Sequence, residues 1–232
     1  MGAGKKKLVI LTGAGISAES GFSTFRDSGG LWEKYDVMQV CSLDGYEADK
    51  ALVINFFNGL RRDLEHAKPN KAHYDVAALE KFFDVSVITQ NVDNLHERAG
   101  SSQVLHLHGE LTKICDESKR EVVDIGYRDI KMGECLGGTQ ARPFIVFFQE
   151  AVPNLDRAVE IVSEADIFVV IGSSLAVYPA ASLINYAPQD CPIFVIDPKP
   201  VSTRRSVTFI QKKASEGVAD LASRLGVDIN KK

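Results

Sequence analysis

The sequence predicts an α/β protein built on a parallel β-sheet. Short apolar runs, rich in β-branched and aromatic residues, recur along the 232-residue chain, and segments with helical periodicity lie between many of them. Most of these runs are continuous rather than alternating, which is typical of strands that are buried on both faces. Alternation of strands and helices produces right-handed βαβ units, and therefore a parallel sheet.

The strands and helices follow from these two patterns. The expected strands are Leu8–Leu11, Val85–Ile88, Val104–Leu107, Phe144–Phe148, Ile167–Ile171, Ile193–Ile196 and Val207–Ile210. The expected helices between them include His73–Phe83, Leu155–Glu164, Ala180–Tyr186 and Glu216–Leu225. Two stretches break the alternation. Residues 36–71 predict helices without a strand between them, and residues 110–141 are polar and poor in pattern, so both are expected beside the main sheet.

Composition excludes several classes of protein. A net charge of −4 lacks the basic footprint that non-specific nucleic-acid binding needs. No apolar run reaches the length of a membrane span, and the run after Lys5–Lys7 is too short for a signal peptide. The four cysteines form no CxxC pair, so we expect free thiols and a cytoplasmic protein.

A glycine-rich stretch directly follows the first expected strand. Thr12-Gly13-Ala14-Gly15-Ile16-Ser17-Ala18 fits the pattern G-x-G-x-x-A, with a helix expected after it. In a dinucleotide site Gly13 allows the tight turn, Gly15 allows close approach of the pyrophosphate and Ala18 allows close packing of the helix on the strand. The stretch therefore predicts dinucleotide binding, although glycine motifs of this kind are also found in simple turns.

Three polar residues follow the strand that ends at Ile88. Gln90, Asn91 and Asp93 would lie at the carboxyl edge of the sheet, where open α/β sheets bind ligands. They could hold ribose hydroxyls, an amide or a water. Capping of a helix over Asn94–Arg98 is the alternative for Asn91 or Asp93.

Two histidines lie near the end of the next strand. On a strand, the side chains of His106 and His108 would point to one face, which favours a general base or a metal site over a structural role. Asp197 and Gly172-Ser173-Ser174 each end a further strand and could contact a ribose, or form ordinary turns. A serine-hydrolase elbow, an HExxH helix and a paired CxxC are all missing from the sequence.

Taken together, these motifs resemble the sirtuins, which are NAD-dependent protein-lysine deacylases. The matching stretches follow the order of the family: residues 13–21, Thr24-Phe25-Arg26, Gly30-Leu31-Trp32, residues 89–96, residues 107–111, Arg142-Pro143, residues 172–175 and residues 177–180. Asn94 and Pro69-Asn70 are most similar to the bacterial branch related to the desuccinylase-type members.

The resemblance implies a Rossmann-like, doubly wound large domain over residues 1–35, 72–109 and 142–232. A small domain would consist of the two stretches that break the alternation, 36–71 and 110–141. The resemblance also implies a reaction in which the acyl-lysine oxygen attacks the nicotinamide ribose as nicotinamide leaves. Water then completes the cycle and gives free lysine and O-acyl-ADP-ribose.

The same resemblance implies roles for particular residues. His108 would be the general base on the ribose hydroxyls, Gln90 and Asn91 would position the ribose, and Asp93 would hold the nicotinamide amide. Phe25 would shield the reacting carbon from water, and Arg26 would support the cofactor loop. The catalytic set is therefore His108, Asn91 and Asp93. The residues expected to bind NAD are Gly13, Ala14, Gly15, Ser17, Phe25, Arg26, Gln90, Asn91, Asp93, Gly172, Ser173, Ser174 and Asp197. A carboxylate at Asp197, where the family usually has asparagine, favours NAD over NADP.

The sequence departs from the family in the second insertion. Members usually hold a structural zinc there with two CxxC pairs, whereas this chain offers Cys115 and Cys135 alone and no histidine between residues 109 and 141. Because structural zinc needs four ligands, we expect no zinc and a core-packing role for both thiols.

A second departure concerns the loop that binds the substrate. The family's Phe-Gly-Glu loop, which pairs with the substrate backbone as an added strand, appears here as Phe148-Gln149-Glu150. Gln149 adds bulk and restricts φ, so peptide binding is expected to be weakened or re-aimed.

The acyl pocket departs as well. Desuccinylase-type relatives carry Tyr-x-x-Arg where this chain has Phe57 and Leu60, and Cys41 takes the position of the small residue that opens the pocket. The pattern alone predicts core residues on one helix face, whereas the resemblance implies an uncharged pocket for acetyl or longer neutral acyl groups.

Three functional hypotheses remain. The first is an NAD-dependent lysine deacylase whose partner is an acyl-lysine protein or peptide. The second is an enzyme that uses NAD for ADP-ribosyl transfer or hydrolysis, which Gln149 favours. The third is a non-catalytic NAD-binding module.

Overall fold

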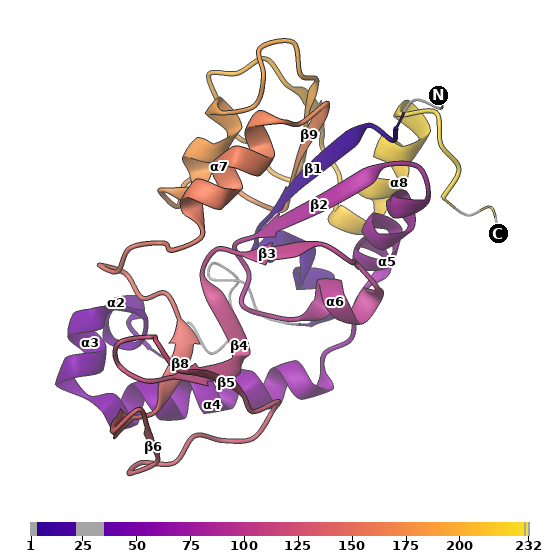
Figure 1. Ribbon diagram of the computed structural model, residues 1–232. Helices are drawn as coiled ribbons and strands as arrows, with labels where there is room; N and C mark the ends of the chain where they lie inside the picture. The colour runs from indigo at the N-terminus through magenta and orange to yellow at the C-terminus, as the bar shows by residue number, and fades with distance from the viewer. Residues whose placement is uncertain (1–3, 22–34, 230, 232) are drawn as a thin grey trace.

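The computed structural model describes residues 4–21, 35–229 and 231, which form a six-stranded parallel sheet with helices on both faces and a second part beside it (Figure 1). The order of the strands in the sheet is β11-β10-β9-β1-β2-β3. Their bounds are β1 Lys7–Thr12, β2 Asp84–Thr89, β3 Val104–His106, β9 Ile167–Ile171, β10 Ile193–Ile196 and β11 Thr208–Ile210. The predicted α/β class with a parallel sheet is confirmed.

Burial on both faces explains the continuous apolar runs. Leu8 and Ile10 of β1 belong to the apolar cluster that includes residues of α5 and α8, whereas Val9 and Leu11 belong to the cluster that includes residues of α7 and η4. Successive side chains of a strand point to opposite faces, so a strand covered on both faces does not alternate between apolar and polar residues. The bounds of these helices are α5 Lys71–Ala78, η3 Leu79–Lys81, α6 Leu95–Ala99, α7 Leu155–Ser163, η4 Ala180–Asn185 and α8 Ala214–Arg224.

The second part packs three helices against a small antiparallel sheet of order β5-β4-β8 (Figure 1). Its elements are α2 Val37–Cys41, α3 Leu43–Ala48, α4 Lys50–His66, β4 Gly109–Cys115, β5 Val122–Asp124, β6 Cys135–Leu136, β7 Thr139–Gln140 and β8 Arg142–Ile145. The helices expected within residues 36–71 are present. The expectation that Phe144–Phe148 forms a strand of the main sheet is wrong, because β8 pairs antiparallel with β4.

Two helical expectations also need correction. Within the described residues, the glycine-rich stretch leads into two short 3₁₀ turns, η1 Ala14–Ile16 and η2 Ala18–Ser20, rather than an α-helix. The segment expected as a helix at residues 180–186 is likewise a 3₁₀ helix. No helix in the described ranges is both long and apolar enough to cross a membrane.

The register of the sheet aligns the strand ends. Thr12 pairs with Thr89 on one side and with Ile171 on the other, Ile171 pairs with Ile196, and Thr89 pairs with His106. The loops that follow these residues therefore emerge side by side at the carboxyl edge. The chain moves from β1 to β2 and β3 and later returns to the other side of β1, so this edge contains the topological switch point where such sheets bind ligands.

Candidate functional site

The loops after β1 and β9 touch each other at glycines. The Gly15 N–H donates to the Gly172 carbonyl over 2.9 Å, and the Gly13 N–H donates to Ile171 over 3.0 Å. A Cβ added at Gly15 would lie 2.6 Å from the Gly172 Cα, and one at Gly172 would lie 2.4 Å from the Ile16 nitrogen. Both positions therefore require glycine, because no side chain fits between the two backbones.

Asn91 joins the loop after β2 to the loop after β1. Its Nδ2 donates to the Gly13 carbonyl and to Ser17 Oγ, each at 3.2 Å, and its backbone N–H donates to Thr89 Oγ1 at 3.0 Å. The side chain is buried and fixed. The structure thus brings together Asn91, Gly13 and Ser17, which the sequence placed far apart.

Asp93 is a buried carboxylate beside this contact. Ser17 Oγ donates to its Oδ2 over 2.9 Å, and the Leu95 N–H at the start of α6 donates to its Oδ1 over 3.1 Å. Burial raises the pKa of Asp93, and these two hydrogen bonds act in the opposite direction. Asp93 therefore combines the two predicted alternatives, since it accepts from the first N–H of α6, although Asn94 is the N-cap residue, and it also contacts the glycine-rich loop through Ser17. Each of its oxygens keeps acceptor capacity for a further N–H.

Gln90 and His108 form the third contact of the site. Gln90 Nε2 donates to Ser173 Oγ over 2.9 Å, and the Gln90 carbonyl lies 2.9 Å from His108 Nδ1. His108 is half-buried, and this burial lowers the pKa of its imidazole. His108 lies beyond the end of β3, so the expectation that it shares a strand face with His106 is wrong.

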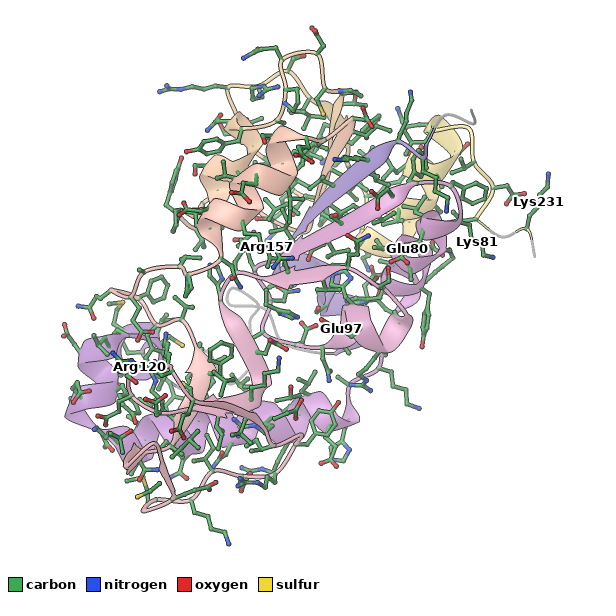
Figure 2. All side chains as sticks on the ribbon, viewed as in Figure 1. Glu80, Lys81, Glu97, Arg120, Arg157 and Lys231 are labelled. Atoms are coloured by element: carbon green, nitrogen blue, oxygen red, sulfur yellow. The ribbon has the colours of Figure 1, made fainter. Side chains whose placement is uncertain are left out.

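His106 is held by two partners within the protein. Its Nδ1 lies 3.0 Å from the Asn91 carbonyl, and its Nε2 lies 2.8 Å from Glu97 Oε1. Glu97 belongs to α6, and Figure 2 labels it there. Burial opposes the charged form of the ring, but the hydrogen bond and the charge of Glu97 outweigh it and raise the pKa of His106. Glu97 was not identified from the sequence, because nothing in the pattern pairs it with a residue nine positions later.

A further row of polar side chains lies directly behind the site. Thr12 Oγ1 donates to Thr89 Oγ1 over 2.8 Å and lies 3.1 Å from His96 Nε2. All three side chains are buried. This row was not identified from the sequence, although Thr12 and Thr89 are the last residues of strands that are neighbours in the sheet. The row supports Asn91, whose N–H donates to Thr89.

The remaining predicted NAD residues lie at the same edge or outside the described ranges. Ala14 is half-buried in η1, Ser174 is exposed after β9, and Asp197 follows β10 with its Oδ1 accepting from the Lys199 N–H over 2.8 Å. Phe25 and Arg26 lie outside the described residues.

The three predicted acyl-pocket residues lie together in the second part of the molecule. Cys41, Phe57 and Leu60 are buried in one apolar cluster, which also contains Phe147 at 5.9 Å between its ring centroid and that of Phe57. Burial raises the pKa of the Cys41 thiol to about 12, so the group is a neutral thiol at physiological pH.

The two cysteines of the second insertion differ in their surroundings. Cys115 is buried, with its Sγ 3.8 Å from the Pro143 carbonyl, but Cys135 is exposed. The expected core-packing role is therefore wrong for Cys135, which lies on the two-residue strand β6 at the surface. Over residues 4–21, 35–229 and 231, no group of three or more His, Cys, Asp or Glu side chains is arranged to hold a metal ion.

The geometry supports a specific kind of chemistry. Glycine backbone, amide, hydroxyl and carboxylate groups converge at one edge of the sheet, together with an imidazole that is neutral at physiological pH. Such an edge fits a nucleotide with phosphates and riboses, and the imidazole can accept a proton from a hydroxyl.

The chain matches the Sir2 family over residues 13–179. It is similar to a protein named NAD-dependent protein deacylase from Bacteroides thetaiotaomicron, at 57% identity over 95% of this chain and 98% of the relative. A protein of the same name from Helicobacter pylori strain J99 is 48% identical, over 95% of each chain.

Two solved Sir2 structures with a similar fold contain NAD or an acetylated ADP-ribose. A Sir2 homologue in complex with NAD has a TM-score of 0.85 and 36% identity, over 96% of this chain and 90% of the other. A Sir2 protein with a deacetylated p53 peptide and 3'-O-acetyl-ADP-ribose has a TM-score of 0.80 and 28% identity, over 97% of this chain and 95% of the other.

Proposed function

This chain belongs to the Sir2 family, and on that premise we propose that its site works as an NAD-dependent protein-lysine deacylase for neutral acyl groups. The deacylase activity follows from relatives that are 48–57% identical over nearly their whole length. The observation that supports the residue roles is that Asn91 and Asp93 contact the glycine-rich loop at Gly13 and Ser17, while His108 contacts Gln90 next to Asn91.

The residues at the sheet edge fit NAD. Gly13 and Gly15 lie against Gly172, and the lack of a Cβ at these positions would let a pyrophosphate approach the backbone of the loop closely. Asp93 offers acceptor capacity to an amide N–H, as the nicotinamide carboxamide requires. We propose that Asp197 accepts from a ribose hydroxyl. Its carboxylate would repel the 2′-phosphate of NADP, so we expect NAD rather than NADP. When bound, NAD supplies the ribose carbon that the acyl oxygen attacks as nicotinamide leaves.

His108 acts as the general base in this proposal. A carbonyl only accepts hydrogen bonds, so the 2.9 Å contact with Gln90 places the proton of the neutral ring on Nδ1. Nε2 then carries a lone pair and can take a proton from a ribose hydroxyl. Because burial lowers its pKa, the ring is in its basic form at neutral pH.

Gln90 and Asn91 act as positioning groups. Gln90 is tied to β1 through its N–H, 2.9 Å from the Thr12 carbonyl, and to the loop after β9 through Ser173. Asn91 is fixed by Gly13 and Ser17. Such groups reduce the reorganisation that the reaction would otherwise need.

The acyl group is proposed to enter beside Cys41, Phe57 and Leu60. None of these side chains carries a charge or a hydroxyl, so an acyl carboxylate would find no partner among them. We also expect the protein to bind no structural zinc, since Cys115 and Cys135 would supply at most two ligands.

The experiment is an incubation of the purified protein with NAD and an acetyl-lysine peptide, with the products identified by mass spectrometry. Deacylated peptide together with O-acetyl-ADP-ribose is the expected result. Nicotinamide release without peptide turnover would instead indicate ADP-ribosyl transfer or NAD hydrolysis. NAD binding without any turnover would indicate a non-catalytic module.

A further inference from the structure

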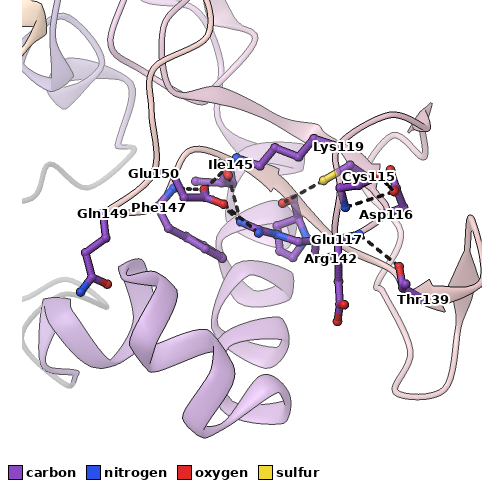
Figure 3. A network of polar contacts seen from close by, with 12 residues as sticks. Cys115, Asp116, Glu117, Lys119, Thr139, Arg142, Ile145, Phe147, Gln149 and Glu150 are labelled. Carbon is purple, nitrogen blue, oxygen red and sulfur yellow. Dashed lines mark hydrogen bonds and ion pairs between the residues drawn. The ribbon is translucent and has the colours of Figure 1, made fainter.

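The loop over residues 147–150 is anchored on its inner side by a partly buried ion pair between Glu150 and Arg142 (Figure 3). The Glu150 carboxylate accepts from Arg142 Nη1 at 2.9 Å, from Lys119 Nζ at 2.7 Å and from the Phe147 N–H at 2.7 Å. Burial opposes ionisation of Glu150, but these donors outweigh it and lower its pKa. One end of the loop is therefore fixed by charge.

Arg142 is itself held in place by packing. Its guanidinium carbon lies 4.2 Å from the centroid of the Phe147 ring and 5.0 Å from that of Tyr46, and the side chain is 2% exposed. Cation–π contacts of this kind add to the ion pair. The anchor thus ties the loop to the core of the second part.

Gln149 makes a different contact on the outer side of the loop. Its Nε2 donates to Asp44 Oδ2 over 2.6 Å, and its Oε1 accepts from the Asp44 N–H over 3.2 Å. In Figure 3 its side chain points away from the Glu150 ion pairs. Gln149 has φ 78°, a left-handed backbone conformation that is unfavourable for residues with a Cβ. A glycine would adopt this φ more easily, but it could not make the two hydrogen bonds to Asp44.

The backbone of Phe148 lies between these two fixed points. Its N–H donates to the Cys41 carbonyl over 2.8 Å, and its carbonyl accepts from the Leu43 N–H over 3.1 Å. Residues 41–44 thus hold residues 148–149 through both backbone and side chain. The Phe148 side chain remains 42% exposed beside this contact.

We propose that Gln149 is a positioning residue for the acyl-peptide substrate, because its pair with Asp44 latches the 147–150 loop onto the first turn of α3. The inference rests on the proposed deacylase function, in which this loop pairs with the substrate backbone. A loop fixed before binding loses less conformational entropy when a peptide strand adds to it. The latch acts on peptide affinity and leaves the NAD edge untouched.

The latch can be tested by placing a second negative charge beside Asp44 and then moving the charge from one side of the pair to the other. Gln149→Glu keeps the size of the side chain but sets a carboxylate against Asp44. The double variant Gln149→Glu with Asp44→Asn restores a donor–acceptor pair in the reverse direction. We expect the single variant to raise the KM for an acetyl-lysine peptide about three- to tenfold. The KM for NAD and the kcat at saturating peptide should change less than about twofold, and the double variant should return the peptide KM towards the wild-type value.

Gln103 provides the matched control. Its Nε2 donates to Asp84 Oδ1 over 3.1 Å at the opposite, amino end of strands β2 and β3, where both side chains are exposed. Gln103→Glu creates the same like-charge pair far from the loop and should leave the peptide KM unchanged. An unchanged peptide KM in Gln149→Glu would overturn the latch, as would a failure of the double variant to recover it while its thermal unfolding remains normal.

Binding of a fluorescent acetyl-lysine peptide, followed by anisotropy, separates this inference from the proposed function. Wild-type protein that binds the peptide without deacylating it contradicts the function, while weaker binding by Gln149→Glu would still support the latch. Wild-type protein that binds no peptide contradicts both.

Discussion

The Nδ1 atom of His108 lies 2.9 Å from the backbone carbonyl of Gln90. This contact selects the tautomer of the ring and leaves Nε2 to accept a proton. Gln90 is in turn held by Thr12 and Ser173, so the orientation of His108 depends on the end of β1 and on the loops that follow β2 and β9. A proposed base and a proposed nucleotide cradle are therefore parts of one hydrogen-bonded unit.

The pH dependence of deacylation should follow the lowered pKa of His108. A base works in its neutral form, whose fraction grows as the pH rises through its pKa. Since burial lowers this pKa from 6.5, kcat/KM for the peptide should increase with pH through a midpoint below 6.5 and then level off. Initial rates in overlapping buffers check this. A midpoint above 6.5 would show that another group controls the rate.

His106 should make the stability of the fold depend on pH. The raised pKa of His106 means that its stabilising effect is fully present below the unfolded-state value of 6.5 and is lost as the pH rises through the folded-state pKa. The lowered pKa of Glu97 gives a contribution that is lost as the pH falls through its folded-state pKa, which lies below 4.5.

The difference in free energy of unfolding between wild type and His106→Gln should therefore be largest between about pH 4.5 and pH 6.5. It should become smaller above that range. Thermal unfolding at several pH values measures it. The same substitution at His66, which is exposed at the end of α4, serves as the control. A difference in thermal stability between wild type and His106→Gln that increases at alkaline pH would contradict the ion pair between His106 and Glu97.

Gly15→Ala should destabilise the protein and weaken NAD binding. The added Cβ would lie 2.6 Å from the Gly172 Cα, which is backbone and cannot rotate away. Overpacking of this kind costs about 1–3 kcal/mol, and for a chain of this size each kcal/mol lowers the Tm by about 2–4 °C. Gly4→Ala is the control, because its Cβ would meet nothing within 4 Å. Equal melting temperatures for both variants would contradict the close approach.

Succinyl-lysine and malonyl-lysine should be poor substrates compared with acetyl-lysine. A carboxylate beside Phe57 and Leu60 would lose its hydration without gaining a partner, at a cost of several kcal/mol. The double variant Phe57→Tyr with Leu60→Arg should raise kcat/KM for succinyl-lysine relative to acetyl-lysine, by about tenfold for each 1.4 kcal/mol of transition-state stabilisation regained. Acyl variants of one peptide test this. Succinyl-lysine exceeding every neutral acyl group in wild-type protein would refute the proposed pocket.

The strands of the main sheet could be predicted from the sequence because they are buried on both faces. Leu8 to Leu11 could be read as a strand since each face of β1 packs against its own cluster, and that pattern needs no partner to be visible. The carboxyl-edge residues followed from the strand ends.

The second part was less predictable for physical reasons. Strands β4 and β8 pair antiparallel with an irregular register between Gly109 and Ile114, which disrupts the alternation that would reveal them. The contacts between His106 and Glu97 and between Gln149 and Asp44 depend on tertiary structure, so local sequence patterns could not show them. The division of the chain into two domains at the stated boundaries stays a prediction.

The central claim is tested most directly by product stoichiometry in wild-type protein and His108→Ala, with an acetyl-lysine peptide and NAD. Wild-type protein should form nicotinamide, deacylated peptide and O-acetyl-ADP-ribose in equal amounts. His108→Ala should form deacylated peptide about 10²–10⁴-fold more slowly, as expected for loss of a general base, while His66→Ala remains normal. Near-normal turnover by His108→Ala, or nicotinamide in large excess over deacylated peptide in wild-type protein, would contradict the account.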